Sequence, residues 1–311
     1  MTSPSHFIKL PGARRPAFRA ARAACGLLLA VHACLLLPAP ARAALKLAYC
    51  RDDGRHWQVW LAEPDGNGAR ALTDSPWDKR TLRTAADPAR LLSRDNEGRL
   101  HELALPGGGT NRQILNQLDV VKDFDFTPRH GFLISSYAPN SLDNVVVWHC
   151  AADGSGLRLL NRDPFLNEMP RWLPDGSGFV YVRSHGPKSV LCRADASGGN
   201  IREVLPGVSD AIADPCPDPT GRWIAFCRER DKNMDLWVAR LDGSDARSVH
   251  AGPGLEAEPA WSPDGNWIYF ATADAGRFRI ARVGRDGRGL THLTPSDVDA
   301  RCPVLLDLKS N

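Results

Sequence analysis

Short apolar runs separated by turn residues recur along this chain, most clearly between residues 256 and 294. Two such runs, residues 267–271 and 277–283, lie between the turn sequences Pro263-Asp-Gly265 and Asp286-Gly287. Runs of this length are too short for helices and fit β-strands that alternate with tight turns. The segment therefore predicts four short strands that form one blade of a sheet.

The same pattern returns upstream at a nearly constant spacing. The prolines that precede its first strand, Pro170, Pro215 and Pro259, stand 45 and 44 residues apart. A four-stranded unit repeated about every 40 to 45 residues is typical of a β-propeller, because no single sheet can bury both of its faces without neighbours.

Six units of this period fit between residue 44 and the C-terminus. Residues 44–73 lack the first strand of a unit, whereas residues 300–306 carry an isolated first strand, with Pro303 placed 44 residues after Pro259. We therefore expect the C-terminal strand to pair into the first blade, which removes an open sheet edge. The other units are residues 75–115, 118–160, 166–205, 209–250 and 256–294. The prediction is an all-β, six-bladed β-propeller that forms one domain over residues 44–311.

Residues 1–43 have the features of a secretory signal peptide that is removed after Ala43. They carry six basic residues, no acidic residue, an apolar run near residues 25–37 and Ala41-Arg-Ala43 at the end. The apolar run is too short for a good membrane span. A twin-arginine signal at Arg14-Arg15 and a lipidated Cys34 are the alternatives.

The formal net charge of +3 belongs to this leader. Six of the 39 basic residues lie in it, so the remaining chain has 33 basic and 36 acidic residues and a net charge of −3. A weakly acidic chain gives no support for binding nucleic acid through its phosphates.

Six cysteines remain after the leader, an even number in a protein bound for an oxidising compartment. Cys216 and Cys227 are expected on adjacent strands of one blade, and Cys50 and Cys302 at the closure of the ring. These two pairs are candidate disulfides. The alternative is six buried, unpaired cysteines that act as small apolar residues. No C-x-x-C sequence occurs, which argues against a zinc site.

Several segments resemble the β-propeller repeat of the TolB family. Trp261-Ser-Pro-Asp-Gly265 precedes an apolar strand, and Asp286-Gly287 is followed by Leu290-Thr-His-Leu-Thr294. Trp172-Leu-Pro-Asp-Gly176 fits the same pattern. The similarity covers nearly all of residues 44–308 and is strongest from residue 166 onward. It implies a periplasmic propeller from a bacterium, most often a Gram-negative one.

The resemblance is specific for the fold but not for the function. The same repeat also builds the propellers of prolyl-oligopeptidase-like peptidases and of some polysaccharide lyases. TolB itself resembles a two-part protein with an α/β domain ahead of its propeller. Here the propeller follows the leader directly, so a role identical to that of TolB is not implied.

The sequence contains no recognisable catalytic motif. G-x-S-x-G, H-E-x-x-H and the phosphate-binding G-x-x-x-x-G-K-[ST] are all absent, and the histidines are scattered over unrelated positions of the repeat. Trp172 and Trp261 share one repeat position, which favours core packing. Trp57 and Trp77 fall outside that register and are better candidates for exposed aromatic side chains.

Acidic residues recur just before the innermost strand of the units: Asp125, Glu168, Asp214, Glu258 and Asp299. The innermost strands of a propeller line its central channel, so these carboxylates could gather at one mouth and attract a cation or a basic segment. We expect mainly acidic residues at this channel. The alternative is that each carboxylate accepts N–H groups of its own turn.

We therefore predict a periplasmic binding module with no cofactor and no metal site, whose partner is an envelope protein, lipoprotein or peptide. TolB-like proteins are similar in using that end of the propeller for a lipoprotein partner. Two other functions stay open. One is a propeller enzyme such as a lyase that acts on an acidic polysaccharide, and the other is a sensor of a small ligand or Ca²⁺.

Overall fold

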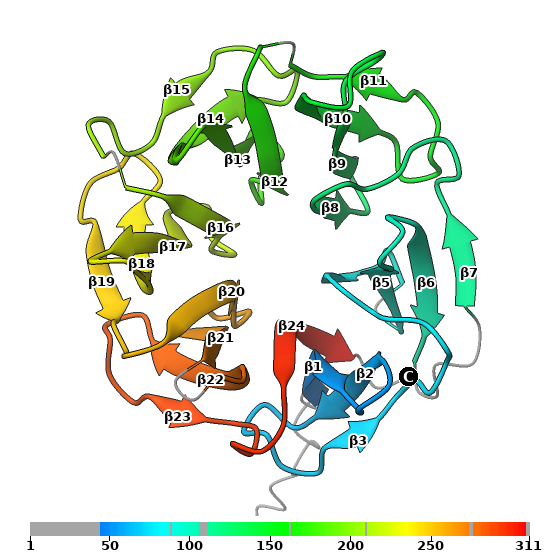
Figure 1. Ribbon diagram of the computed structural model, residues 1–311, viewed down its shortest axis with the longest axis vertical. Coiled ribbons are helices and arrows are strands. Elements are labelled where there is room, and N and C mark those ends of the chain that lie inside the picture. The colour runs from blue at the N-terminus through cyan, green and yellow to red at the C-terminus, as the bar shows by residue number, and fades with distance from the viewer. Residues whose placement is uncertain are drawn as a thin grey trace, which may run out of the picture. The chain divides into compact units, whose positions relative to one another are not determined.

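The structure, a computed structural model, describes residues 44–308 apart from 88, 106–110, 162, 209 and 274–275. The predicted signal peptide lies outside the described residues. Within these residues, twenty-four strands form six four-stranded antiparallel sheets, arranged as the blades of a propeller (Figure 1). No helix long and apolar enough to cross a membrane occurs among the described residues.

Each blade runs from an innermost strand at the channel to an outermost strand at the rim, and the strands of each blade are given in that order. Blade 1 consists of β24 (Ala300–Leu308), β1 (Ala44–Asp52), β2 (Trp57–Ala62) and β3 (Arg70–Ala71). Blade 2 consists of β4 (Leu82–Thr84), β5 (Arg90–Arg94), β6 (Leu100–Ala104) and β7 (Asn111–Ile114). Blade 3 consists of β8 (Phe124–Thr127), β9 (Gly131–Tyr137), β10 (Val145–Cys150) and β11 (Arg158–Leu159).

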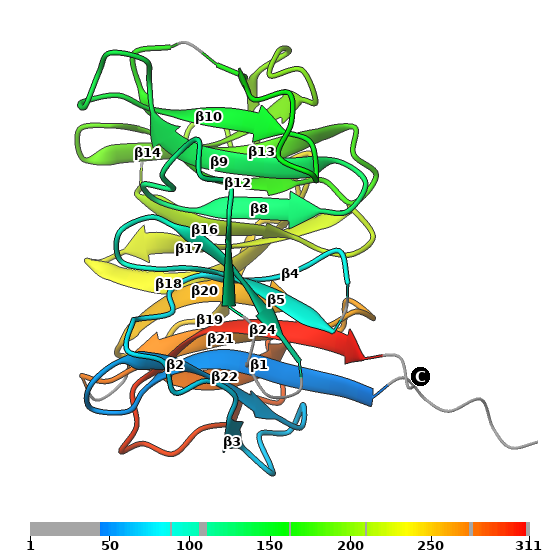
Figure 2. The same cartoon turned by 90° about the vertical axis from the view of Figure 1, so that its right-hand side faces the viewer.

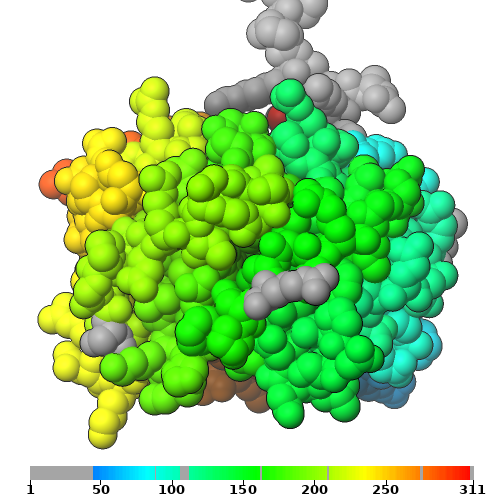
Figure 3. Space-filling model, turned by 90° about the horizontal axis from the view of Figure 1, so that it is seen from above, coloured from blue at the N-terminus to red at the C-terminus, as the bar shows by residue number. Residues whose placement is uncertain are grey.

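Blade 4 consists of β12 (Leu166–Trp172), β13 (Gly178–His185), β14 (Lys188–Asp195) and β15 (Arg202–Glu203). Blade 5 consists of β16 (Ile212–Pro217), β17 (Trp223–Arg230), β18 (Asn233–Arg240) and β19 (Arg247–His250). Blade 6 consists of β20 (Leu255–Trp261), β21 (Trp267–Ala273), β22 (Arg279–Gly284) and β23 (Thr291–His292). Figure 3 shows blades 5, 4, 3 and 2 side by side along the rim.

The ring is closed as the repeat pattern predicts. Strand β24 pairs antiparallel with β1, with Leu47 opposite Leu305 and Ala48 opposite Val304. The two strands lie side by side in Figure 2, although they come from opposite ends of the described chain. The six-bladed all-β propeller and its closure by the C-terminal strand are therefore confirmed.

The core lies between neighbouring blades. Phe226 of β17 packs in one cluster with Val180 of β13, and Phe270 of β21 packs in another with Val238 of β18; all four side chains are fully buried. Each blade thus covers the apolar face of the next one, which is why the isolated sheet would not be stable.

The two tryptophans at the shared repeat position also tie one blade to the previous one. The indole N–H of Trp172 donates to the carbonyl oxygen of Gly131 at 3.1 Å, and that of Trp261 donates to Cys216 at 2.8 Å. Both side chains are buried, so their interpretation as core residues is confirmed.

Four inner strands share a bulge at the residue before their proline. Met169, Asp214, Glu258 and Cys302 adopt positive φ angles of 53°, 51°, 56° and 55°. The register of strand pairing shifts at each of these four residues, in β12, β16, β20 and the closing strand β24. Left-handed backbone is uncommon for residues other than glycine, and a bulge redirects the side chain that it carries. The bulge sets which side chains reach the channel.

Candidate binding site in the central channel

A cavity of about 460 Å³ lies where the inner strands converge. All six blades contribute to its wall, through residues such as Cys302 of β24, Arg83 of β4, Asp125 of β8, Met169 of β12, Asp214 of β16 and Glu258 of β20. The four residues with positive φ are all among the lining residues. The repeated bulge therefore builds the wall of the cavity.

Three of the five predicted acidic residues line this cavity: Asp125, Asp214 and Glu258. Glu168 does not, because it comes one residue before the bulge and successive side chains of a strand point to opposite faces. Its carboxylate is buried and lies 3.4 Å from the ammonium group of Lys122. Asp299 precedes β24 and accepts the backbone N–H of Phe278 at 3.1 Å, away from the lining.

The three lining carboxylates accept hydrogen bonds from the next blade rather than from their own turns. Asp125 accepts the N–H of Trp172 at 2.7 Å, Asp214 that of Glu258 at 3.0 Å, and Glu258 that of Cys302 at 2.7 Å. Each bond joins the inner strands of two neighbouring blades. The three bonds join blades 3 and 4, blades 5 and 6, and blades 6 and 1, respectively. The carboxylates thus help to hold the ring together, and the second oxygen of Glu258 also accepts from the Cys302 thiol at 3.4 Å.

The expectation that acidic residues dominate the channel is wrong. Four acidic residues line the cavity, but so do seven basic ones: Lys79, Arg80, Arg83, Arg94, Lys122, Arg171 and Arg301. Five of these come from residues 79–122, in the units 75–115 and 118–160. Reasoning from the repeat register missed them because connecting segments, the short strand β4 and the end of β5 supply them.

Asp123 is a further lining residue that the sequence did not single out. Its carboxylate binds two guanidinium groups, that of Arg171 at 2.5 Å and that of Arg83 at 3.1 Å from both oxygens. Burial works against ionisation, but the charges of Arg171 and Arg83 outweigh it and lower the pKa of Asp123. Asp125 adds a second carboxylate, whose Oδ1 lies 3.6 Å from Nε of Arg83. Two carboxylates thus balance the two guanidinium groups, and the cluster fixes the wall between blades 2, 3 and 4.

Asp214 and Glu258 are in a different situation. Neither carboxylate forms an ion pair with any residue that the structure describes. Burial raises the pKa of both groups, and the neighbouring charge of Asp214 raises that of Glu258 further. A cation placed between them would remove this cost, so the pair is suited to an ammonium or guanidinium group.

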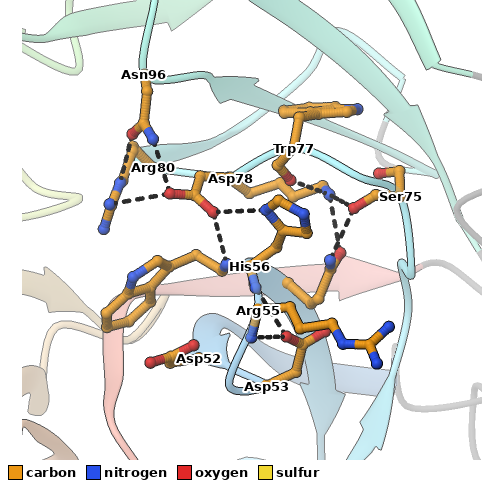
Figure 4. A network of polar contacts seen from close by, with 12 residues as sticks. Asp52, Asp53, Arg55, His56, Ser75, Trp77, Asp78, Arg80 and Asn96 are labelled. Atoms are coloured by element: carbon orange, nitrogen blue, oxygen red, sulfur yellow. Dashed lines mark hydrogen bonds and ion pairs between the residues drawn. The ribbon is translucent and has the colours of Figure 1, made fainter.

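A polar network holds the basic side of the cavity between blades 1 and 2 (Figure 4). Asp78 accepts hydrogen bonds from the Trp57 backbone at 3.0 Å, from Asn96 at 2.7 Å and from Arg80 at 3.1 Å. The Arg80 guanidinium is also bonded to Asn96 at 2.9 Å and lies 5.1 Å from the centre of the Trp57 ring. The network fixes the direction in which Arg80 and Trp57 meet the cavity.

Lys79 is fully buried beside this network. Its ammonium group donates to the side chain of Gln58 at 2.8 Å and to the carbonyl oxygens of Ser75 and Trp77 at 3.2 and 2.6 Å. Burial lowers its pKa to about 8. All three N–H groups are used, so Lys79 contributes charge to the cavity rather than a contact.

The aromatic candidates differ in position. Trp57 is partly buried and lines the cavity, whereas the ring of Trp77 packs on that of His101, with 4.3 Å between their centres. Neither ring projects freely from the surface. Of these two candidates, Trp57 lines the cavity, as Trp261 of the repeat register also does.

All six described cysteines carry free thiols in the structure. Cys50 and Cys302 pack in one cluster at the ring closure, and both line the cavity. Cys216 stands opposite Ala225, and Cys227 stands opposite Ala213, so this pair is offset along adjacent strands. Both bridges stay predictions.

Within the described ranges, no group of histidine, cysteine, aspartate or glutamate side chains is arranged to hold a metal ion. No histidine is among the lining residues of the cavity. The lining combines charged side chains with two tryptophans, Trp57 and Trp261, and with apolar residues such as Leu82 and Met169.

Comparisons with known proteins support the fold. The TolB beta propeller domain matches residues 150–305. The chain is 32% identical over 138 residues to the Tol-Pal system protein TolB of Bordetella pertussis, which covers 44% of this chain and 31% of that protein. It is 37% identical over 125 residues to the uncharacterized protein Atu1656 of Agrobacterium fabrum, covering 40% and 42% of the two chains. The matches thus span less than half of these curated relatives.

Among solved structures, TolB from Acinetobacter baumannii superposes with a TM-score of 0.74 at 17% sequence identity. The superposition covers 86% of this chain and 68% of that one. At this level of identity the likeness concerns the fold.

Proposed function

Because the chain belongs to the TolB β-propeller family, we propose that it is a binding module of the bacterial periplasm, and that a segment of an envelope protein enters its central cavity. The observation that carries this proposal is the pair Asp214 and Glu258. Both carboxylates face the cavity without a cationic partner among the described residues, and both are held at equivalent bulges of the repeat.

The pair is suited to a basic group of the partner. Leaving two carboxylates close together in a partly buried place is unfavourable, and a structure keeps such a cost where it serves recognition. Asp125 also lines the cavity and is part of the proposed partner surface, but its carboxylate already has the Arg83 guanidinium at 3.6 Å. Glu168 and Asp299, the other two predicted residues, do not line the cavity, and the partner surface proposed here does not rest on them. No residue is given a catalytic role.

Site-specific photocrosslinking in living cells tests this proposal. A crosslinking amino acid at Pro219, an exposed residue that lines the cavity, is expected to capture a defined envelope protein. Ala246, an exposed residue of the same blade away from the cavity, is the matched control position and is expected to give no such product.

The combined substitution Asp214→Asn and Glu258→Gln is expected to abolish the crosslinked product while the protein still melts cooperatively. Equal capture at Pro219 and Ala246, or capture that survives the double substitution, would contradict the proposal.

A further inference from the structure

The basic residues of the cavity are concentrated on one side. Arg94 ends β5, Arg80 precedes β4, and Arg301 lies in β24, so all three come from blades 1 and 2. We call Arg80, Arg94 and Arg301 the basic arc. The backbone N–H of Arg80 donates to the carbonyl oxygen of Arg94 at 2.7 Å, and the Cys50 thiol bridges from Arg80 toward the Cys302 end of β24. The arc is a continuous part of the wall.

Two guanidinium groups of the arc have spare donors. Arg94 makes one hydrogen bond, to the carbonyl oxygen of Val120 at 3.3 Å, and its Nε is buried without a partner in the part of the chain that the structure describes. The Arg301 guanidinium forms a long ion pair with Asp299, with Nε 3.8 Å from Oδ1, but makes no hydrogen bond in that part of the chain. Each guanidinium has five N–H donors, and a buried donor without an acceptor is costly. An acceptor supplied by a ligand would remove that cost.

Aromatic rings hold the arc in place. The Arg301 guanidinium lies 3.8 Å from the centre of the Phe278 ring and 5.6 Å from that of Trp57, which also packs with Arg80. Stacking on aromatic rings restricts the guanidinium planes, so less side-chain entropy is lost when a ligand binds. Buried Lys79 adds positive charge behind them. The arc is therefore ordered and electropositive before a ligand arrives.

The acidic pair lies on other blades. Asp214 belongs to β16 of blade 5, which stands across the ring from blade 2, and Glu258 belongs to β20 of blade 6 (Figure 1). One cavity thus presents a cationic wall and an anionic wall that are not neutralised by each other. Arg301 acts weakly on Glu258, but no ion pair joins the two walls among the described residues.

We propose that the basic arc binds a carboxylate of the inserted segment while Asp214 and Glu258 bind a cationic group of the same segment, so that the cavity selects a peptide with both charges. This inference rests on the proposed function. A polyuronide carries one sign of charge and would be repelled by the acidic pair, whereas a peptide supplies both signs. A cavity of about 460 Å³ is the size that takes a short segment of a few residues.

Isothermal titration calorimetry with defined peptides tests the inference. The probes are acetylated, amidated peptides with one lysine and one glutamate separated by glycine spacers of increasing length, together with versions in which glutamine replaces the glutamate. At one spacer length, the peptide with both charges is expected to bind about tenfold more tightly than the glutamine version, because a hydrogen bond to a charged group is lost.

Variants assign the effect to the arc. Arg94→Gln and Arg301→Gln are each expected to weaken binding of the doubly charged peptide about tenfold and to leave the glutamine version unchanged. Arg202→Gln, at an exposed position of β15, is the matched control and is expected to change neither. The Nε–H signals of Arg94 and Arg301 in an NMR spectrum are expected to shift when the glutamate peptide is added.

The outcomes separate this inference from the function on which it rests. Equal binding of the glutamate and glutamine peptides, with capture at Pro219 intact, would overturn the arc and leave the binding module standing. Charge-selective peptide binding without capture at Pro219 would support the arc and contradict the envelope partner. Tighter binding of trigalacturonate than of any peptide would overturn the choice of a peptide.

Discussion

The two halves of the ring are built differently. In blades 4, 5 and 6 the inner strands β12, β16 and β20 have six or seven residues and repeat the bulge before a proline. In blades 2 and 3 the inner strands β4 and β8 have three and four residues, and no described residue in them has a positive φ angle. The regular half supplies the unpaired acids of the cavity, and the irregular half supplies most of its cations.

The difference shows how a repeat protein acquires a specific site. A repeated bulge gives every copy the same channel-facing position, and sequence change at that position then varies the side chain without altering the backbone. Where the repeat is degenerate, connecting segments such as residues 74–81 reach the channel and bring side chains that the repeat does not place. The cavity combines both sources, so its two walls carry opposite charge.

The largest expected effect comes from the cluster that joins the two halves. Asp123→Asn is expected to lower the free energy of unfolding by about 3 to 5 kcal/mol, because it removes the carboxylate that binds the guanidinium groups of both Arg83 and Arg171. Urea denaturation at neutral pH measures this. Asp307→Asn, at an exposed position of β24, is the control. A loss no larger than that of the control would show that the cluster does not stabilise the ring.

The carboxylate of Asp123 also makes the stability of the ring depend on pH in the acid range. Because the pKa of Asp123 is lowered in the folded protein, its contribution is present above the unfolded value of 3.8 and is lost as the pH falls through the folded value. The stability difference between wild type and Asp123→Asn is therefore expected to shrink in acid.

The ring closure offers the next effect. If Cys50 and Cys302 are oxidised in the periplasm, the bridge joins the first and last strands and is expected to add about 2 to 4 kcal/mol to the free energy of unfolding. Mass spectrometry of alkylated protein purified from the periplasm is expected to find four free thiols among the six cysteines of the wild type. The Cys302→Ser variant, which cannot form the bridge, is expected to have all five of its cysteines free. Six reactive thiols in unfolded wild-type protein would contradict the bridge, and a link between Cys216 and Cys227 would be found in the same experiment.

Buried Lys79 predicts a gain of stability in base. Its pKa is about 8 in the folded protein against an ordinary value of 10.5, so the unfolded chain binds more protons between these values and stability rises with pH across that window. The rise attributable to Lys79 is about 3 kcal/mol when the whole window is crossed. Urea denaturation across this pH range measures it. Lys79→Met is expected to lack this rise, whereas the exposed Lys188→Met control keeps it.

The smallest effect has the opposite sign to that of Asp123. The pKa of Asp214 is raised in the folded protein, so its contribution is favourable below the unfolded value and is lost as the pH rises through the folded value. Asp214→Asn is therefore expected to raise the free energy of unfolding at neutral pH by on the order of 1 kcal/mol. The amide oxygen can still accept the Glu258 N–H. Thermal unfolding at neutral and acid pH checks this, and destabilisation at both would contradict the assignment.

Much of the fold could be predicted from the sequence, because its signals are local and repeated. Turn sequences such as Pro263-Asp-Gly265 and the proline spacing specify the blades, and the missing first strand of residues 44–73 points to the C-terminal strand. These patterns reflect backbone requirements that each copy must meet by itself.

The candidate site could be predicted only in part. Asp214 and Glu258 sit at the repeat position and reach the cavity, but a difference of one residue turns Glu168 to the other face of its strand. Arg80 and Arg94 of blade 2 are brought to Arg301 of blade 1 by contacts between blades, for which the sequence carries no local signal. The charge of the cavity depends on such meetings, which is why acids were expected and both signs are found.

The most direct test of the account is an NMR titration of the side-chain carboxyl carbons in the cavity. The account holds that one cavity contains a neutralised cluster at Asp123 and an acidic pair without cations at Asp214 and Glu258. It predicts that Asp123 titrates below its ordinary pKa of 3.8, and that Asp214 and Glu258 titrate above theirs, 3.8 and 4.5. A lowered pKa at Asp214 or Glu258 would contradict it, because such a value would mean that a cation of the protein already occupies the proposed site.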